Sequence, residues 1–170
     1  YSTTAKYTPA TYKNPYSNLS KWYDSSRKKA QIDCSTLTKF VYMGLDYDHS
    51  PYKNHKMTSI KRNTSYSWAF TFPRTAAEQA EYCVSHGWVL HDVDTEKYSN
   101  LEPGDLIFWD RDNKENGRYM NCSHVAICIG EVDGAINTIE STTCTNGVKI
   151  RPITENTADK ILFVARPKKA

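Results

Sequence analysis

The segment SHVAICIG, residues 123–130, decides the fold, because it is a short apolar run with one imidazole, His124, near its start. Other runs in the C-terminal half have the same character, being short, rich in β-branched or aromatic residues and bounded by Gly, Asp or Asn. They cover residues 106–109, 136–140, 148–151 and 161–165. Such runs are typical of strands joined by hairpins. The sequence therefore predicts an antiparallel sheet in the second half of the chain.

Two helices are expected before this sheet. The first covers residues 32–45, where Leu37, Phe40, Val41 and Gly44 recur at three- and four-residue steps and predict one buried stripe. The second covers residues 75–86 and ends at Gly87. Its inward positions are Ala76, Ala77, Ala80 and either Cys83 or Val84. Residues 47–74 between the helices read as a long polar loop. Helices first and strands later predict an α+β fold.

The size and charge of the chain limit its organisation and its partners. With 170 residues it is long enough for one ordinary domain, and its net charge of +3 is too small for a dedicated nucleic-acid binder. Its apolar runs are too short to cross a bilayer. Residues 1–20 read as a linker or N-terminal arm, and residues 21–170 as the domain. The chain opens on Tyr1, and we expect further domains in the full-length protein.

Cys34 and His124 are the strongest candidates for catalytic residues. Cys34 falls in the first turn of the first predicted helix, where free backbone amides and the helix dipole stabilise a thiolate. Asp33 and Ser35 flank it and can cap those amides. A cysteine at a helix start facing a histidine on a sheet forms the nucleophile and base of papain-like enzymes. On this basis Cys34 is the candidate nucleophile and His124 the candidate base.

A third group should orient the imidazole, and the strand after His124 offers two. Residues of one parity share a face of a strand. If Ile139 enters the core, Glu140 lies on the opposite, polar side. We therefore favour Glu140, with Asn137 as the alternative.

A zinc site is the alternative for the same segment, since Cys122, His124 and Cys128 are all zinc-ligating residue types. On one strand these even-numbered residues would share a face but spread over about 20 Å, too far for one ion. We expect neither a metal nor a cofactor.

Three stretches together resemble the NlpC/P60 cell-wall peptidases. IDCSTLTKFVY (32–42) is similar to their nucleophile segment, LEPGDLIFW (101–109) to their Pro-Gly-Asp turn and strand, and SHVAICIG (123–130) to their histidine strand. GVKIRPI (147–153) and VARP (164–167) resemble the closing strands of that family. The resemblance covers roughly residues 22–167 and implies a papain-like fold with N-terminal helices packed on a C-terminal antiparallel sheet.

The resemblance implies hydrolysis of bacterial peptidoglycan stem peptides at γ-D-glutamyl bonds to a diamino acid. It assigns Cys34 as nucleophile, His124 as base and Glu140 as orienting residue, although the family more often has His, Asn or Gln at the third position. Asp33 and Ser35 match positions that bind the substrate peptide. Tyr23 or Trp22 would replace the upstream tyrosine of the family.

Two other functions remain open at this point. One is a CHAP-like amidase or cross-bridge endopeptidase of a phage lysin or tail protein, which differs in the bond cleaved. The other is a non-catalytic wall-binding module, in which exposed aromatic side chains would stack on sugar or peptide. The expected location is secreted or cell-wall associated, or in a phage virion or lysin that acts on the wall.

Overall fold

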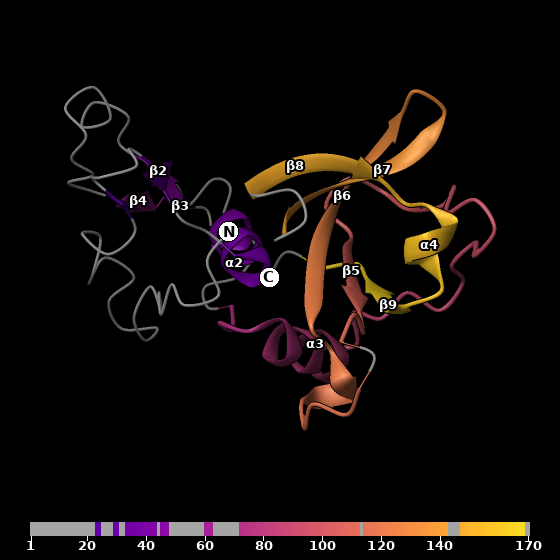
Figure 1. The fold of residues 1–170 in the computed structure, drawn as a ribbon, viewed down its shortest axis with the longest axis horizontal. Coiled ribbons are helices and arrows are strands. Elements are labelled where there is room, and N and C mark those ends of the chain that lie inside the picture. Colours follow the sequence, from indigo (N-terminus) through magenta and orange to yellow (C-terminus); the bar gives the residue numbers. More distant parts are fainter. Residues whose placement is uncertain are drawn as a thin grey trace.

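A curved five-stranded antiparallel sheet forms the centre of the fold in the computed structural model (Figure 1). The structure describes residues 23–24, 29–30, 33–43, 45–47, 60–62, 72–112, 114–142 and 147–168. The sheet has the order β8-β7-β6-β5-β9. Its strands are β5 (Leu106–Trp109), β6 (His124–Val132), β7 (Ala135–Thr142), β8 (Gly147–Pro152) and β9 (Ile161–Ala165). The strands lie where the sequence predicts them, three of them being longer, and the α+β class is confirmed.

The helices and two small hairpins complete the described structure. The helices are α2 (Cys34–Tyr42), α3 (Ala76–Ser85), α4 (Glu155–Ala158) and the 3-10 helix η2 (Tyr119–Asn121). The hairpins pair β1 (Tyr23–Asp24) with β2 (Lys29–Ala30), and β3 (Leu45–Tyr47) with β4 (Ile60–Arg62). β4 lies inside the segment predicted as a polar loop, so that prediction was wrong there. The predicted arm at residues 1–20 lies outside the described residues. Within the part of the chain that is described, no helix is both long and apolar enough to span a membrane.

α2 is shorter than the sequence predicts and has a different buried face. It begins after Asp33, whose side chain accepts the Thr36 N–H and caps the helix, and it ends at Met43. Phe40 is buried as expected, but Val41 is 47% exposed, so its predicted burial was wrong. The buried face instead includes Thr38, whose hydroxyl donates to Gln79 of α3. Buried polar contacts between α2 and α3 thus set the rotation of α2, and an apolar periodicity does not detect them.

α3 has nearly the bounds that the sequence predicts for the second helix. Thr75 and Glu78 cap each other reciprocally at its start, and the chain turns at Gly87 with φ +64°. Cys83 is fully buried whereas Val84 is 37% exposed, which decides between the two inward positions left open by the sequence.

Both faces of the sheet are covered, which the sequence does not predict. Alternate residues of β6 enter different clusters: Val125 and Ile127 pack with the helices, whereas Ala126 and Cys128 pack with Trp109 on the other face. A polar residue on either face of the central strands is therefore buried. This has direct consequences for Glu140 and His124.

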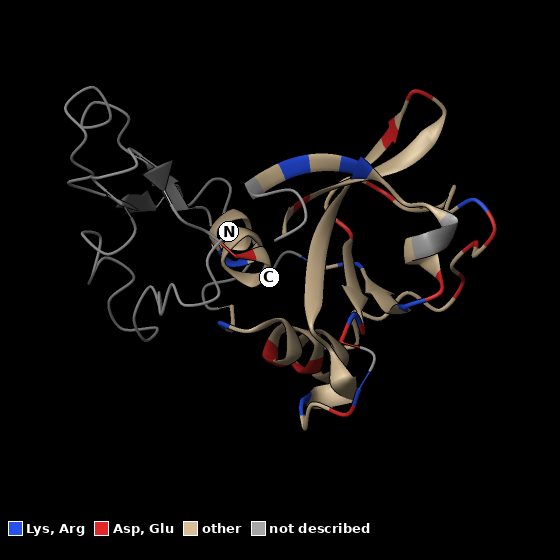
Figure 2. Ribbon diagram, viewed as in Figure 1, with Lys and Arg blue, Asp and Glu red and all other residues tan. Residues whose placement is uncertain are grey.

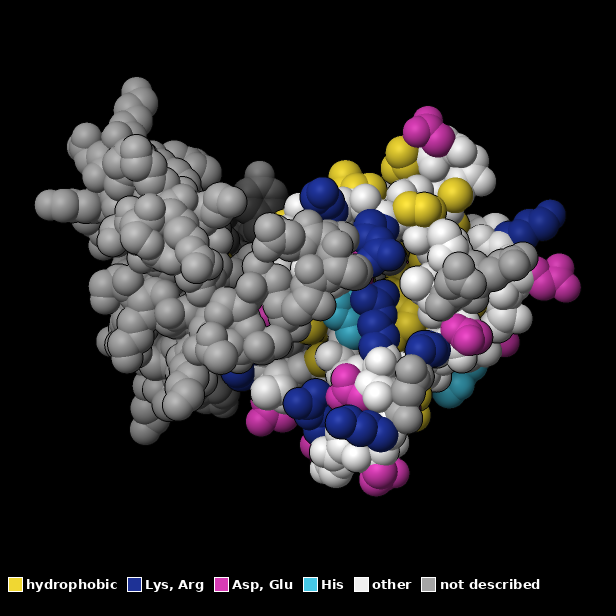
Figure 3. Space-filling view, in the orientation of Figure 1, with side chains coloured by type: hydrophobic (Ala, Val, Ile, Leu, Met, Phe, Trp, Pro, Cys, Tyr) yellow, Lys and Arg dark blue, Asp and Glu magenta, His cyan; other side chains and the backbone are white. Residues whose placement is uncertain are grey.

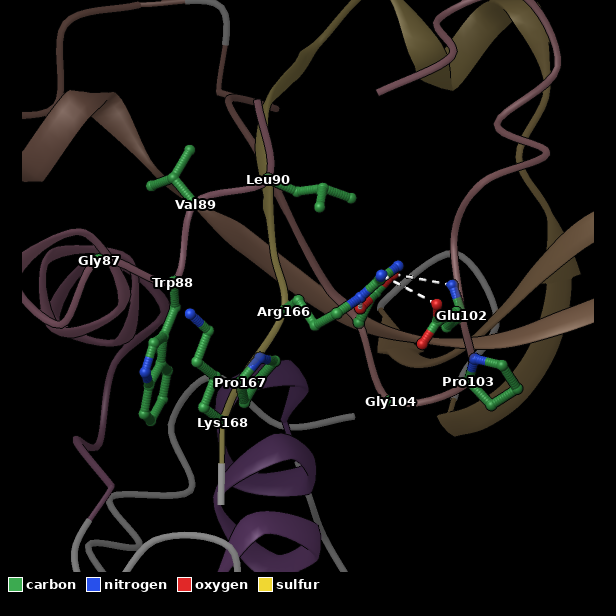
Figure 4. Close-up of a pocket in the computed structure, with 11 residues that line it drawn as sticks. Gly87, Trp88, Val89, Leu90, Glu102, Pro103, Gly104, Arg166, Pro167 and Lys168 are labelled. Atoms are coloured by element: carbon green, nitrogen blue, oxygen red, sulfur yellow. Dashed lines mark hydrogen bonds and ion pairs between the residues drawn. The ribbon is translucent and has the colours of Figure 1, made fainter. Parts of the chain in front are cut away.

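The Pro103-Gly104-Asp105 turn is tied to the end of β9. Asp105 is 2% exposed and forms two contacts of 2.8 Å with Arg166, while Glu102 accepts a third bond from the same guanidinium (Figure 4). These groups border a cavity of about 350 Å³ that includes Trp88 and Lys168. The cavity is lined by neither Cys34 nor His124. The turn and the tail are therefore held together by ion pairs, apart from Cys34 and His124.

Candidate active site

Cys34 is the first residue of α2 and lies near the start of β6. α2 packs on β6 and β7, and the backbone N–H of Val125 lies close enough to the Cys34 sulfur to act against the rise in the pKa of its thiol. Val125 directly follows His124 in β6. The fold thus brings the nucleophile candidate next to the strand that carries the base candidate, across ninety residues of sequence.

Burial favours the neutral thiol of Cys34. The residue is 5% exposed, and this burial, with the nearby charge of Asp33, raises the pKa of the thiol to about 11. The backbone N–H groups of Val125 and Ser35 act in the opposite direction but do not compensate. The sequence predicts a thiolate stabilised by the helix start. That expectation fails in this structure, because desolvation outweighs the amides.

His124 and Glu140 form a close, buried pair. Nε2 of the imidazole lies 2.5 Å from Oε2 of the carboxylate, and the two residues are 5% and 2% exposed. If Glu140 is ionised it can only accept, so Nε2 carries the proton and Nδ1 is the nitrogen left to act as a base. The carboxylate predicted to orient the imidazole is therefore in contact with it.

A bulge in β6 makes this contact possible. From the hairpin the register runs Val132↔Ala135, Glu131↔Ile136 and Gly130↔Asn137, and then it shifts by one residue to Cys128↔Thr138 and Ile127↔Ile139. Without the shift, Glu140 would share the face of Ile127, opposite to His124. Gly130 permits the bulge with φ +89°, a value that other residues rarely adopt. One extra residue thus sets which face the carboxylate occupies.

Glu140 is surrounded by basic groups. Arg151 Nη1 lies 3.2 Å from Oε1, and Arg111 Nη1 lies 3.4 Å from Oε2. Burial by itself would raise the pKa of Glu140, but the hydrogen bond from His124 and the charges of His124 and the two arginines lower it overall. Glu140 is therefore a buried carboxylate held ionised by its neighbours, in place of the solvated group expected on the polar side of the sheet.

The imidazole is favoured in its neutral form. Burial is the largest influence and lowers the pKa of His124, and Arg111 and Arg151 lower it further, against the raising effect of Glu140. Among the described residues, no hydrogen bond joins the His124 ring to the Cys34 sulfur. The thiol and the imidazole are thus both favoured in their neutral forms in the resting protein. In free enzymes, catalytic hydrogen bonds are often long and tighten only with substrate.

Asp33 and Ser35 lie beside Cys34 but contact an arginine. Arg74 donates to Asp33 Oδ2 at 2.5 Å and to Ser35 Oγ at 2.9 Å, and Asp33 also accepts from Ser35. Asp33 therefore caps the helix and binds Arg74. Its predicted contact with a substrate peptide stays a prediction.

The other sequence candidates lie apart from the pair. The Asn137 amide donates to Val132 O and Ala135 O within the hairpin, away from His124. Tyr23 belongs to β1 through its backbone, and its side chain and Trp22 lie outside the described residues. Cys122 and Cys128 enter different hydrophobic clusters, so the expectation that they share a face was wrong. In the described residues, no three His, Cys, Asp or Glu side chains are grouped to hold a metal ion.

Arg111 and Arg151 are the site residues that sequence reasoning missed. Arg111 follows β5 at the end of the LIFWD run, and Arg151 lies within β8. Both read as ordinary surface charges, because only the pairing of β7 with β8 and the bulge in β6 bring them to Glu140. Arg151 lies opposite Thr138, diagonal to Glu140, so its contact with Glu140 could have been predicted only from the register of β7 and β8.

Comparisons with known proteins point to one family. The family model described as NlpC/P60 family matches residues 21–167. Two solved structures are similar: an NlpC/P60 family protein from Bacillus cereus, with 23% identity and a TM-score of 0.47, and the peptidoglycan hydrolase RipB from Mycobacterium tuberculosis, with 17% identity and a TM-score of 0.43. The matches cover 81% and 86% of this chain, but only 32% and 50% of those chains. No curated protein sequence matches significantly.

Proposed function

Because the chain belongs to the NlpC/P60 family, we propose that it is a cysteine peptidase that hydrolyses stem-peptide amide bonds of bacterial peptidoglycan. Within this class we propose cleavage of the γ-D-glutamyl bond to the diamino acid. Cys34 is the nucleophile, His124 the base and Glu140 the orienting residue. The protein acts on the cell wall, whether as a secreted or wall-associated enzyme or as part of a phage.

One observation carries the proposal: Cys34 adjoins the backbone of the strand that begins at His124, and the His124 ring contacts Glu140. The Val125 N–H lies near the Cys34 sulfur, His124 is the residue before Val125, and the His124 ring contacts Glu140 at 2.5 Å. These are the residue types and the order needed for a nucleophile, a base and a group that fixes the base.

In the first half of the reaction, Nδ1 of His124 takes the thiol proton as Cys34 attacks the amide carbon. A neutral starting pair suits this role, since a neutral imidazole can accept a proton at once. The oxyanion that forms lies at the start of α2. Among the described residues none accepts from the Cys34 N–H, so this amide is available to the oxyanion.

In the second half, the imidazolium protonates the leaving amine and His124 then removes a proton from water. The water attacks the thioester and releases the acyl half of the peptide. Glu140 stabilises the imidazolium that exists between these steps, and it remains a carboxylate throughout. Arg111 and Arg151 keep the Glu140 side chain ionised.

The pH dependence of kcat/KM should be that of a site whose active form has a neutral thiol and a neutral imidazole. The active form needs an unprotonated imidazole, and the pKa of His124 is lowered, so activity should fall with a midpoint below 6.5 on the acidic side. The thiol pKa of about 11 leaves a broad plateau above that midpoint. Initial rates on a soluble muropeptide across the pH range measure this profile. An acidic midpoint above about pH 7 would contradict the assignment.

Digestion of defined muropeptides tests the function itself. The products, separated and identified by mass spectrometry, should be a fragment ending in D-glutamate and a fragment beginning with the diamino acid. Release of an intact stem peptide from the sugar, or a cut in the cross-bridge, would instead support the CHAP-like alternative. Absence of any product from any muropeptide would refute the enzyme.

A non-catalytic wall-binding module is the second candidate, and the thiol pKa of about 11 is the observation in its favour. A thiol with so high a pKa is a weak nucleophile until a base approaches it. Both candidates predict slow alkylation of Cys34 in the free protein, so thiol labelling alone does not separate them. Turnover separates them, because a binding module retains muropeptides without cutting them.

A further inference from the structure

Arg111 has a surplus of hydrogen-bond donors at the edge of the site. Its guanidinium carries five N–H groups, and among the described residues its one anionic contact is the 3.4 Å approach to Glu140 Oε2. That oxygen already accepts from His124 at 2.5 Å, and Oε1 has Arg151. Glu140 thus has two closer partners without Arg111. A role limited to holding Glu140 leaves most of this guanidinium unused.

The guanidinium of Arg111 is also fixed in place. It lies over the ring of Trp109, 4.9 Å from the centroid, and its backbone N–H donates to Ser123 Oγ at 2.8 Å. Trp109 is itself 2% exposed within the sheet. A cation held on an aromatic face has already lost much of its conformational freedom, so binding an anion costs it less entropy.

Arg111 is more exposed than the buried pair that it adjoins, and in the cluster only Arg151, with a side chain that is 33% exposed, is more exposed still. The Arg111 side chain is 24% exposed, against 2% for Glu140 and 6% for His124. Lys149 and Arg151 share a face of β8, since they are two residues apart, and Figure 2 shows positively charged residues along that strand. Figure 3 shows a run of Lys and Arg side chains across the described part of the face in view, with histidine atoms beside it. An anion approaching His124 therefore meets a positive surface first.

We propose that Arg111 binds a carboxylate of the substrate next to the scissile bond, and that it selects this carboxylate over the corresponding carboxamide. The inference rests on the proposed function. In a γ-linked glutamyl residue the α-carboxylate stays free, and only the Cα and two methylene groups separate it from the carbonyl carbon that Cys34 attacks. A carbonyl held between Cys34 and His124 thus brings this carboxylate within reach of a guanidinium beside His124. The planar fork of arginine pairs with a carboxylate through two parallel hydrogen bonds.

A pair of muropeptides that differ only at this group provides the test: one carries the α-carboxylate, the other the α-carboxamide. Wild-type kcat/KM should favour the carboxylate by about tenfold or more, as expected for a charge-assisted pair. Arg111→Gln should bring the ratio close to one, and Arg111→Lys should restore part of it. Arg151→Gln is the matched control: it also removes a cation from Glu140, but it should slow both substrates alike and keep their ratio.

The same ratio is measured as binding affinity in a Cys34→Ala background, so that loss of turnover in an arginine variant does not hide the result. A ratio unchanged by Arg111→Gln would overturn the inference, as would an equal collapse in Arg151→Gln, which would reduce Arg111 to support for Glu140. Wild-type cleavage of both muropeptides at equal rates would overturn the inference and leave the proposed hydrolase intact. Cleavage of neither would overturn both.

Discussion

Replacing Cys34 by alanine should abolish hydrolysis of muropeptides, lowering kcat by about four orders of magnitude or more. The sulfur is the only atom of the protein that bonds to the substrate carbon in the proposed mechanism. No neighbouring side chain in the described cluster can replace it, since Ser35 Oγ contacts Asp33 and Arg74. Steady-state rates on one soluble muropeptide, compared with the wild type, measure the loss.

The structure predicts that the Cys34→Ala variant still folds. Cys34 is buried in the cluster that contains Val125, and the sulfur is the only heavy atom removed. We expect a loss in the free energy of unfolding of at most about 1 kcal/mol, measured by urea denaturation. Activity near the wild-type level in this folded variant would refute Cys34 as the nucleophile.

Replacing His124 by alanine should lower kcat by about 10²- to 10⁴-fold, and Glu140→Gln should lower it less than His124→Ala does. Removal of the imidazole takes away the group that moves the proton in both halves of the reaction. Glutamine keeps an oxygen that can accept from Nε2, so the ring keeps its tautomer and orientation and loses only the stabilising charge.

Which of these two variants loses more kcat tests whether Glu140 is the orienting group. A larger loss for Glu140→Gln than for His124→Ala would mean that the carboxylate has another role. Asn137→Ala is the control, since its amide bonds only to backbone oxygens of the hairpin, and it should leave kcat within about threefold of the wild type. A loss in Asn137→Ala as large as that in Glu140→Gln would contradict the choice of Glu140.

Local sequence patterns predicted most of the fold. The five strands, the start of α3 at Thr75 and the turn at Gly87 all come from signals that neighbouring residues carry. The predictions that were wrong concern features that depend on tertiary packing. Val41 fits an apolar stripe, but the rotation of α2 is set by the contact of Thr38 with Gln79, forty-one residues away.

The sequence predicted part of the candidate site, but the reason for choosing Glu140 was incomplete. Glu140 was chosen because Ile139 should enter the core, and Ile139 does pack on it. Yet the opposite face is buried as well, and Glu140 meets His124 only because the bulge before Gly130 shifts the register. Arg111 and Arg151 follow from the same register, so no local pattern could have assigned them to the site. The raised thiol pKa likewise depends on burial, which a helix-start argument does not include.

The central claim is that the Cys34 sulfur bonds to the carbonyl carbon of a γ-D-glutamyl group. A γ-glutamyl muropeptide fragment ending in a diazomethyl ketone places an electrophile at that carbon, and peptide mapping by mass spectrometry locates its adduct. The account predicts one adduct per chain, on Cys34, with parallel loss of activity and no labelling in His124→Ala over the same time. Labelling of Cys83, Cys122 or Cys128 in place of Cys34, or full activity after Cys34 is modified, would contradict it.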